Sequence, residues 1–382
     1  MTSQGVPEVP RARLGPLRRA GDGGQGIVYF TDRVKINVSW EAAYKEYLPT
    51  TSFNPYVLRQ MVAFVPELDA DSGRWLCENT AWPAALVVDG GQVTGFLMRR
   101  IPERFRMPWG ENGADVPAAL QYLLNPQTYL NRKGIHLDGR ARLRLLEAIA
   151  DVMARLHSLN VIVGDLSPNN LLVDLSNPGC FFIDCDAMRL RGQDVLDQVE
   201  TPEWSIPGRG REPTATAAAD SYKFGLLAIR LFAQDQMGQD VSALAGVSND
   251  LGVLARRSLD DNSTSRPSMG DWLSVLRTAQ FGRVQQAPPA RRVITSPWSS
   301  RRVAVPPQPA AATAYASTAP RATTPVGNTP PHQTVAPKPT AAARSPQASV
   351  EHPVLTAVVT WMVLLLALGC AVSVVAFVVN LF

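Results

Sequence analysis

The stretch Val161-Ile-Val-Gly-Asp-Leu-Ser-Pro-Asn-Asn-Leu-Leu-Val173 is followed closely by Phe181-Phe-Ile-Asp-Cys-Asp186. An Asp, an Asn five residues later, an apolar pair, a short turn and a second strand ending in Asp form the layout of a phosphoryl-transfer site. We expect Asp165 to orient a substrate hydroxyl. Asn170 and Asp184 are the predicted ligands of Mg²⁺ on ATP, because this hard cation prefers oxygen. Either half alone is also typical of turn formers and strand ends, and only the combination favours the chemistry.

The charge of the chain is unevenly distributed. The 382 residues carry a net charge of +4, but residues 284–350 contain seven basic residues and no acid, and the tail adds only Glu351. Residues 1–283 therefore carry a net charge of −2. A slightly acidic globular part argues against a nucleic-acid-binding domain. The cysteines have no metal-binding spacing and are expected to be reduced, structural thiols. They are Cys77, Cys180, Cys185 and Cys370.

A glycine-rich stretch, Gly21-Asp-Gly-Gly-Gln-Gly-Ile-Val-Tyr29, fits the pattern Gly-x-Gly-x-x-Gly-x-Val. Gly21, Gly23 and Gly26 would let backbone N–H groups approach phosphates without a Cβ in the way, and Val28 would lie beside the nucleotide. Glycine-rich turns are common, so the motif alone is weak. The apolar run that follows predicts a β-strand instead of the helix of a dinucleotide fold, which favours a flap over ATP.

A lysine for the α- and β-phosphates is expected on the next strand. Lys45, in Ala42-Ala-Tyr-Lys45, is the better candidate and Lys35 the competing one. A helix beginning near Leu58 would carry the acidic partner of that lysine. Gln60 occupies a plausible position and Glu67 follows a proline, so the sequence identifies no partner.

Two further strands are predicted around the Asp-Gly-Gly turn of residues 82–98. The second strand would end at a connector, Met98 to Ile101, whose backbone would hydrogen-bond the adenine. Helical spacing of apolar residues predicts a helix over Arg140 to Leu159, with Asp138 as its N-cap. The segment Asp220 to Phe232 is apolar on nearly all sides and is predicted to be a central helix.

These residues resemble a eukaryotic-type Ser/Thr protein kinase domain. Residues 156–171 are similar to its catalytic loop and the helix before it, Ile183-Asp-Cys-Asp186 stands where Asp-Phe-Gly belongs, and Thr201-Pro-Glu-Trp-Ser-Ile-Pro207 where the segment ending in Ala-Pro-Glu belongs. Asp220-Ser-Tyr-Lys-Phe-Gly225 is similar to the family's central-helix motif, and Ser265-Arg-Pro267 to its late Arg-Pro. Together with the glycine-rich loop, the motifs occur in the family's order over residues 20–275. The sequences Trp82-Pro-Ala-Ala-Leu-Val and Ile183-Asp-Cys-Asp186 look closest to those of a divergent bacterial branch of this family, whose kinase domains are often linked to helix-hairpin-helix domains.

The resemblance implies an α+β, bilobal kinase-like fold with a small β-rich N-lobe and a helical C-lobe over residues 20–283, after an extension of residues 1–19. It implies ATP and Mg²⁺, or Mn²⁺, as cofactors. The implied site comprises Asp165 as catalytic residue, Asn170 and Asp184 as metal ligands, and Gly21, Gly23, Gly26, Val28, Lys45 and Met98 around the nucleotide.

Several positions depart from the family pattern. Val163 and Gly164 replace the His-Arg before Asp165, and no Ser, Thr or Tyr lies between Asp184 and Glu200, so activation by phosphorylation within that loop is not expected, apart from Thr201 itself. Ser167 replaces the Lys that reaches the γ-phosphate, and Cys185-Asp186 replaces Phe-Gly. Gly208 replaces the Glu that would pair with Arg266, for which Glu203 and Glu212 are the available substitutes.

The C-terminal part changes composition abruptly. Residues 284–353 are rich in Pro, Ala, Thr, Ser and Arg and predict a disordered linker. Val354 to Phe382 contains an uncharged apolar run of about 26 residues, which as a helix would span roughly 39 Å and could cross a membrane. Lys338 and Arg344 precede this run, which predicts a cytoplasmic kinase-like body and an outside C-terminus. No signal peptide is evident at the N-terminus. Gly369 and Ser373 have a spacing that could pair two membrane helices in a homodimer.

The sequence therefore favours a single-pass, membrane-tethered Ser/Thr protein kinase with an unidentified protein substrate. A membrane-anchored pseudokinase that acts as a nucleotide-binding adaptor or scaffold remains the alternative, because of Ser167, Gly208 and the missing helix carboxylate. A kinase-fold phosphotransferase acting on a small molecule is a third possibility.

Overall fold

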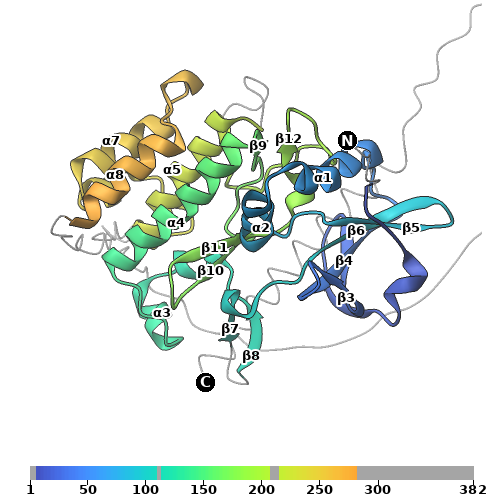
Figure 1. Cartoon of the computed structure of the whole chain (residues 1–382). Coiled ribbons are helices and arrows are strands. Elements are labelled where there is room, and N and C mark those ends of the chain that lie inside the picture. Colours follow the sequence, from blue (N-terminus) through green and yellow to red (C-terminus); the bar gives the residue numbers. More distant parts are fainter. Residues whose placement is uncertain (1–5, 110–112, 207–214, 282–382) are drawn as a thin grey trace, which may run out of the picture. The chain divides into compact units, whose positions relative to one another are not determined.

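The strands between Glu8 and Arg99 form a six-stranded sheet in the computed structural model (Figure 1). Its order is β1-β5-β6-β4-β3-β2. β1 runs parallel to β5, and the other neighbouring pairs are antiparallel. The strands are β1 (Glu8–Pro10), β2 (Arg18–Asp22), β3 (Gly26–Ile36), β4 (Trp40–Tyr47), β5 (Ala85–Asp89) and β6 (Gln92–Arg99).

Both faces of this sheet are covered, as the alternating residues of β4 show. Ala42 and Tyr44 pack with side chains of β5 and β6 in a small apolar cluster on one face. Ala43 and Tyr47 point the other way, into the main core. Lys45 lies between these two on the same strand face, so it is directed toward the rest of the molecule instead of toward solvent.

Two helices follow β4. α1 (Pro55–Glu67) begins earlier than the helix predicted near Leu58, because the Asn54 side chain accepts the N–H groups of Tyr56 and Val57 and Pro55 occupies the first turn. α2 (Ala70–Asn79) was not predicted. Only three of its residues are buried, which leaves little apolar periodicity to detect.

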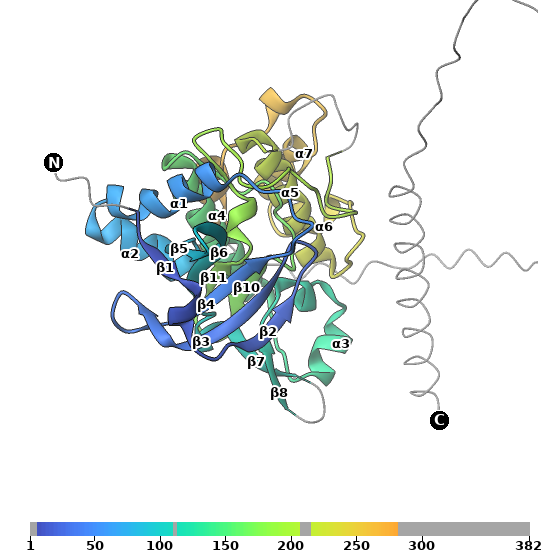
Figure 2. The same cartoon turned by 90° about the vertical axis from the view of Figure 1, so that its right-hand side faces the viewer.

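The helices after residue 138 form the second part of the structure. In Figure 1 they lie together on the side away from β3, β4 and β5, and Figure 2 shows those strands toward the viewer with α4 and α5 behind them. α4 contacts α8, and α5 contacts α6 and α7. The helices are α4 (Gly139–Ser158), α5 (Ala217–Ala233), α6 (Ser242–Ala245), α7 (Asn249–Ser258) and α8 (Met269–Phe281), and the short α3 (Gln127–Arg132) precedes them in the chain.

Two predicted helices are confirmed here. α4 coincides with the predicted helix, and Asp138 caps it by accepting the Ala141 N–H at 2.7 Å. α5 is buried along nearly its whole length, as its apolar sequence indicated. Its buried residues nevertheless include charged side chains, which matter for the site described below.

Short strands and turns connect the sheet to the helices. β6 leads into a hairpin of β7 (Arg106–Trp109) and β8 (Ala114–Pro117), which was not predicted. After α4 come two pairs: β9 with β12, and β10 with β11, both antiparallel. These elements are β9 (Val161–Ile162), β10 (Leu171–Asp174), β11 (Gly179–Phe182) and β12 (Arg189–Leu190).

The structure describes residues 6–109, 113–206 and 215–281, all within the first of two units, Met1–Trp298 and Ser299–Phe382. In this part the chain has a mixed α+β fold with an N-terminal sheet and helices after it. None of the described helices is both long and apolar enough to cross a membrane. The predicted linker of residues 284–353 and the predicted membrane span Val354–Phe382 lie outside the described residues.

Candidate functional site

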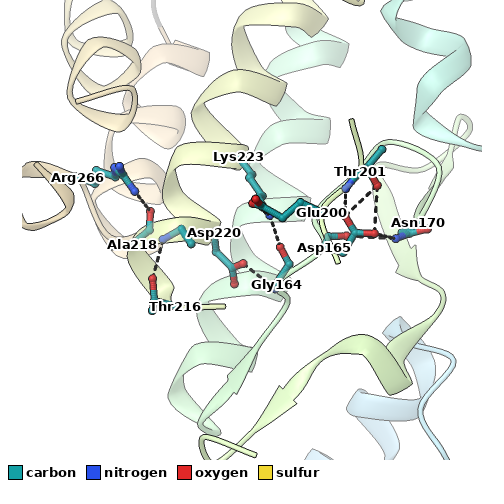
Figure 3. A network of polar contacts seen from close by, with 11 residues as sticks. Gly164, Asp165, Asn170, Glu200, Thr201, Thr216, Ala218, Asp220, Lys223 and Arg266 are labelled. Carbon is teal, nitrogen blue, oxygen red and sulfur yellow. Dashed lines mark hydrogen bonds and ion pairs between the residues drawn. The ribbon is translucent and has the colours of Figure 1, made fainter. Parts of the chain in front are cut away.

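Asp165 lies in the loop between β9 and β10, with both carboxylate oxygens engaged (Figure 3). Its Oδ1 accepts the hydroxyl of Thr201 at 2.9 Å and the backbone N–H of Thr201 at 3.1 Å. Its Oδ2 accepts the side-chain amide of Asn170 at 3.0 Å. Three donors on one carboxylate fix its orientation.

The backbone before Asp165 is anchored on α5. Asp220 is fully buried and accepts the N–H groups of Val163 and Gly164, each at 2.9 Å. Its Oδ2 also lies 2.8 Å from the His157 ring at the end of α4. One side chain thus joins the loop to two helices, which gives Asp165 a rigid support.

A second buried charge of α5 supports the same loop. The Lys223 ammonium donates to the Gly164 carbonyl at 2.8 Å and forms an ion pair with Glu200, also at 2.8 Å (Figure 3). Gly164 has a φ of +71°, and an added Cβ would lie 2.8 Å from the Gln198 side-chain oxygen. Neither Lys223 nor Glu200 was predicted as a functional residue. The available signal was a lysine inside a largely apolar helix.

The hairpin of β10 and β11 brings the two predicted metal ligands to its open end. Leu171 pairs with Phe182, and the Ile183 N–H donates to the Asn170 carbonyl at 3.0 Å. Asn170 and Asp184 therefore lie at the same end of the hairpin, one next to each of its two strands. The Asn170 amide nitrogen is used on Asp165, which leaves its side-chain oxygen as the atom that could bind a cation.

Asp184 adopts a backbone conformation that residues with a side chain rarely take, with φ 54° and ψ 41°. Such conformations persist only where the surroundings enforce them, and they concentrate at functional sites. The Asp184 side chain is 46% exposed, so one of the predicted ligands is accessible. The described residues contain no cluster of three or more His, Cys, Asp or Glu side chains suited to a metal. A cation here would rely on Asp184, the Asn170 amide and oxygen atoms of its own ligand.

Lys45 is the lysine that the fold brings to this site. It is 4% exposed, and its Nζ lies 2.7 Å from Asp186 Oδ1 and 3.3 Å from Asp184 Oδ1. Burial opposes its charge, but the two carboxylates outweigh burial and raise the pKa of Lys45. Lys35, the competing candidate, is exposed on β3.

The predicted glycine-rich flap comprises the end of β2 with Gly21, the turn that follows and the start of β3 with Gly26, and the chain continues as a strand as expected. Gly26 is required by packing, because an added Cβ would lie 2.6 Å from the Glu46 carbonyl oxygen. Gly21 and Gly24 would meet nothing within 4 Å, Gly23 only an ordinary contact at 3.7 Å, and none has a positive φ. Neither packing nor conformation explains these three glycines, which leaves room for close approach of a ligand.

Val28 and Met98 share the sheet face of Lys45. Val28 pairs directly with Lys45 across β3 and β4, and Met98 pairs with Ala43 across β4 and β6. These side chains add apolar surface to the sheet face that carries Lys45. The predicted connector begins later than expected, since β6 runs to Arg99 and the Arg100 N–H is bonded to the Glu41 carbonyl at 2.9 Å.

The departures from the family pattern also have structural counterparts. Ser167 is 2% exposed, and its hydroxyl has no hydrogen-bond partner among the described residues. Arg266 donates to the carbonyls of Asp260 at 3.0 Å and Ala218 at 3.3 Å. Gly208 and Glu212 lie outside the described residues.

The segment after Asp184 is held by an ion pair of its own. The Arg189 guanidinium contacts both Asp194 carboxylate oxygens, with Nε at 3.0 and 3.2 Å. Gln198 donates to Asp194 at 2.8 Å, and the Asn54 N–H donates to the Val195 carbonyl at 2.7 Å. This segment is thereby tied to β12 and to the start of α1 without any phosphate.

No protein-family model matches the chain, and no curated protein sequence matches it either.

Proposed function

We propose that the chain is an ATP- and Mg²⁺-dependent protein kinase of the eukaryotic-type Ser/Thr superfamily, with a bilobal kinase-like fold over residues 20–283. The observation that carries this proposal is the fixed carboxylate of Asp165 beside Asn170 of the hairpin that also carries Asp184. Phosphoryl transfer depends mainly on positioning and charge neutralisation, and this arrangement provides for both.

Each side chain has a defined role in the proposal. Asp165 would accept a hydrogen bond from the acceptor hydroxyl and orient its oxygen. Asn170 and Asp184 would hold Mg²⁺ or Mn²⁺, which supplies charge neutralisation on the phosphates of ATP. Lys45 would bind the α- and β-phosphates.

The surroundings of these residues support a nucleotide. Positions 21, 23 and 24 are free of steric demands, so phosphates could approach the backbone closely there, although the Gly23 N–H already donates to the Gly26 carbonyl at 2.9 Å. Val28, Ala43 and Met98 offer apolar contact for a base next to Lys45.

The membrane tether belongs to the proposal as well. The apolar run of Val354–Phe382 after a basic linker would hold the kinase-like part at the cytoplasmic face of a membrane, with the C-terminus outside. A homodimer through Gly369 and Ser373 would be compatible with this arrangement.

A second function is favoured by Ser167. The hydroxyl that replaces the usual lysine is buried, so position 167 brings no positive charge to the γ-phosphate. A membrane-anchored adaptor that binds nucleotide without transferring phosphate is the function consistent with that loss.

One experiment tests the proposal and separates these functions. The full chain is incubated with γ-labelled ATP, Mg²⁺ or Mn²⁺ and generic protein substrates, beside Asp165→Asn and Asp184→Asn. We expect label on Ser or Thr with the wild type only. Equal labelling in all three proteins would refute the kinase, and magnesium-dependent binding without transfer would favour the adaptor. Transfer to metabolites but not to protein would indicate a small-molecule phosphotransferase.

A further inference from the structure

Asp186 is a fully buried carboxylate placed between two residues of β4. It has no exposed surface, its Oδ1 lies 2.7 Å from the Lys45 ammonium, and its Oδ2 accepts the Tyr47 hydroxyl at 3.0 Å. The Tyr47 ring is itself stacked on Phe53, with ring centroids 4.2 Å apart. Both oxygens of Asp186 are therefore occupied by β4, and neither faces solvent.

Helix α1 offers no such group to Lys45. The acidic residue of α1 is Glu67, which stands at its last position and forms an ion pair with Arg191 at 3.0 Å. The residues of α1 that face the core are apolar. Among the described residues, the carboxylates bonded to Lys45 are Asp184 and Asp186, both from the segment after β11.

We propose that Asp186 is the positioning residue that keeps Lys45 directed at the nucleotide phosphates, so that the lysine is aligned by the segment carrying Asp184 and not by α1. This inference rests on the proposed nucleotide-binding function and deepens it. Its consequence is that a displacement of α1 does not by itself remove the partner of Lys45.

The two carboxylates beside Lys45 differ in how easily water or a phosphate can replace their contact with the ammonium group. Asp186 is inaccessible and closest to the ammonium, and a buried charge that loses its partner is strongly unfavourable. Asp184 is farther away and 46% exposed, so water can replace its contact with Lys45. Lys45 can therefore exchange Asp184 for a phosphate oxygen while it keeps Asp186. That exchange would leave Asp184 free for a cation.

The contact geometry also excludes a metal-binding role for Asp186 in this conformation. A carboxylate whose two oxygens accept from an ammonium and a phenol has no oxygen directed at a cation. Asp184 and Asp186 thus have separate roles, although a single residue separates them.

The test compares variants of the full chain by three measurements: the Kd for MgATP, the KM and kcat of transfer, and the thermal midpoint of the nucleotide-free protein. Asp186→Asn is expected to lower kcat/KM for ATP about 10- to 100-fold and to weaken MgATP binding. Glu67→Gln removes the carboxylate of α1 and is the matched control, expected to leave all three values unchanged.

A double-mutant cycle separates positioning from a structural role. If Asp186 acts through Lys45, Asp186→Asn should cause little further loss in a Lys45→Met background. Fully additive losses in MgATP affinity would overturn the inference. So would an Asp186→Asn protein with wild-type Kd and kcat/KM beside an impaired Lys45→Met.

A milder variant keeps the test decisive if Asp186→Asn does not fold. Tyr47→Phe removes only the hydroxyl that donates to Asp186, and it should lower kcat/KM for ATP roughly fivefold with little change in the thermal midpoint. An unchanged kcat/KM would then contradict the inference. Failure of the proposed function is a distinct result, since the wild-type chain would not bind MgATP at all.

Discussion

Thr201 directs two hydrogen-bond donors at one oxygen of Asp165, its hydroxyl at 2.9 Å and its backbone N–H at 3.1 Å. The residues are 36 positions apart, so this pair ties the segment after β12 to the loop after β9. The contact makes Thr201 a positioning residue for the proposed catalytic carboxylate, and it determines what modification of Thr201 would do.

Phosphorylation of Thr201 is expected to inactivate the protein. A phosphate would remove the donated hydroxyl hydrogen and place like charge against Asp165. Thr201→Glu should therefore be inactive, Thr201→Ala about tenfold slower in kcat, and Thr201→Ser close to the wild type. Mass spectrometry of active protein should find Thr201 unmodified. A requirement for phosphate on Thr201 would contradict the proposed geometry.

Asp220 is expected to contribute more to stability than an ordinary surface carboxylate. Asp220→Ala leaves the buried N–H groups of Val163 and Gly164 without their acceptor, which should lower the free energy of unfolding by about 3–5 kcal/mol. Asp32→Ala, at an exposed position of β3, is the control and should change it by less than about 0.5 kcal/mol. Urea denaturation measures both. Equal stabilities would show that α5 does not anchor the loop.

The glycines of the β2–β3 turn are expected to separate into two kinds. Gly26→Ala forces a Cβ against the Glu46 carbonyl and should cost about 1–3 kcal/mol of stability. Gly23→Ala meets only an ordinary contact, so its thermal midpoint should not fall, yet its MgATP affinity should fall about tenfold. A wild-type affinity of Gly23→Ala for MgATP would show that the glycine-rich turn is not part of the proposed nucleotide site.

The ion pair of Arg189 and Asp194 is expected to hold the segment after Asp184 in its active conformation, so that no phosphorylation is needed for activity. The hydrogen bond to Asp194 raises the pKa of Arg189, and the pair is about a quarter exposed. Phosphatase-treated wild type should keep its kcat, whereas Asp194→Asn should lose about fivefold in kcat at unchanged MgATP affinity. Asp197→Asn, on the exposed surface three residues later, is the control. Full activity of Asp194→Asn would refute this role.

Buried thiols should make the protein less stable at alkaline pH. Cys77, Cys180 and Cys185 are free and buried, and burial raises the pKa of Cys77 from 9.0 to about 11. Between these values the unfolded chain loses the proton while the folded chain keeps it, so stability is intact below pH 9 and falls as the pH rises to 11. The free energy of unfolding, measured with urea at each pH, should fall less steeply with pH between 9 and 11 for Cys77→Ala than for the wild type, by about 1.4 kcal/mol per pH unit. The same pH dependence of the free energy of unfolding in both proteins would contradict the burial of this thiol.

Local patterns were sufficient to predict the elements that carry the site. The apolar spacing and the Asp138 cap located α4, and the chain around Asp165 and Asp184 predicted a loop and a hairpin that the structure contains. Lys45 was preferred over Lys35 because it lies in an apolar strand, and it is the buried one of the two. Each of these predictions depends on residues within a few positions of one another.

The partners across the fold could not be predicted in this way. Lys45 and Asp186 are 141 positions apart, whereas the predicted carboxylate was expected on the helix near Leu58. Lys223 and Glu200 pair between a helix and a loop whose approach no sequence period encodes. Such contacts depend on tertiary packing, which fixes which buried charges meet.

The most direct test of the central claim is phosphoryl transfer per bound nucleotide by wild type and Asp165→Asn. Asp165 is held by Thr201 and Asn170 and makes no contact with Lys45, so its amide variant should bind MgATP with wild-type affinity. We expect transfer to Ser or Thr to fall at least about 100-fold at equal nucleotide occupancy. Transfer at the wild-type rate by the saturated Asp165→Asn protein would contradict the account.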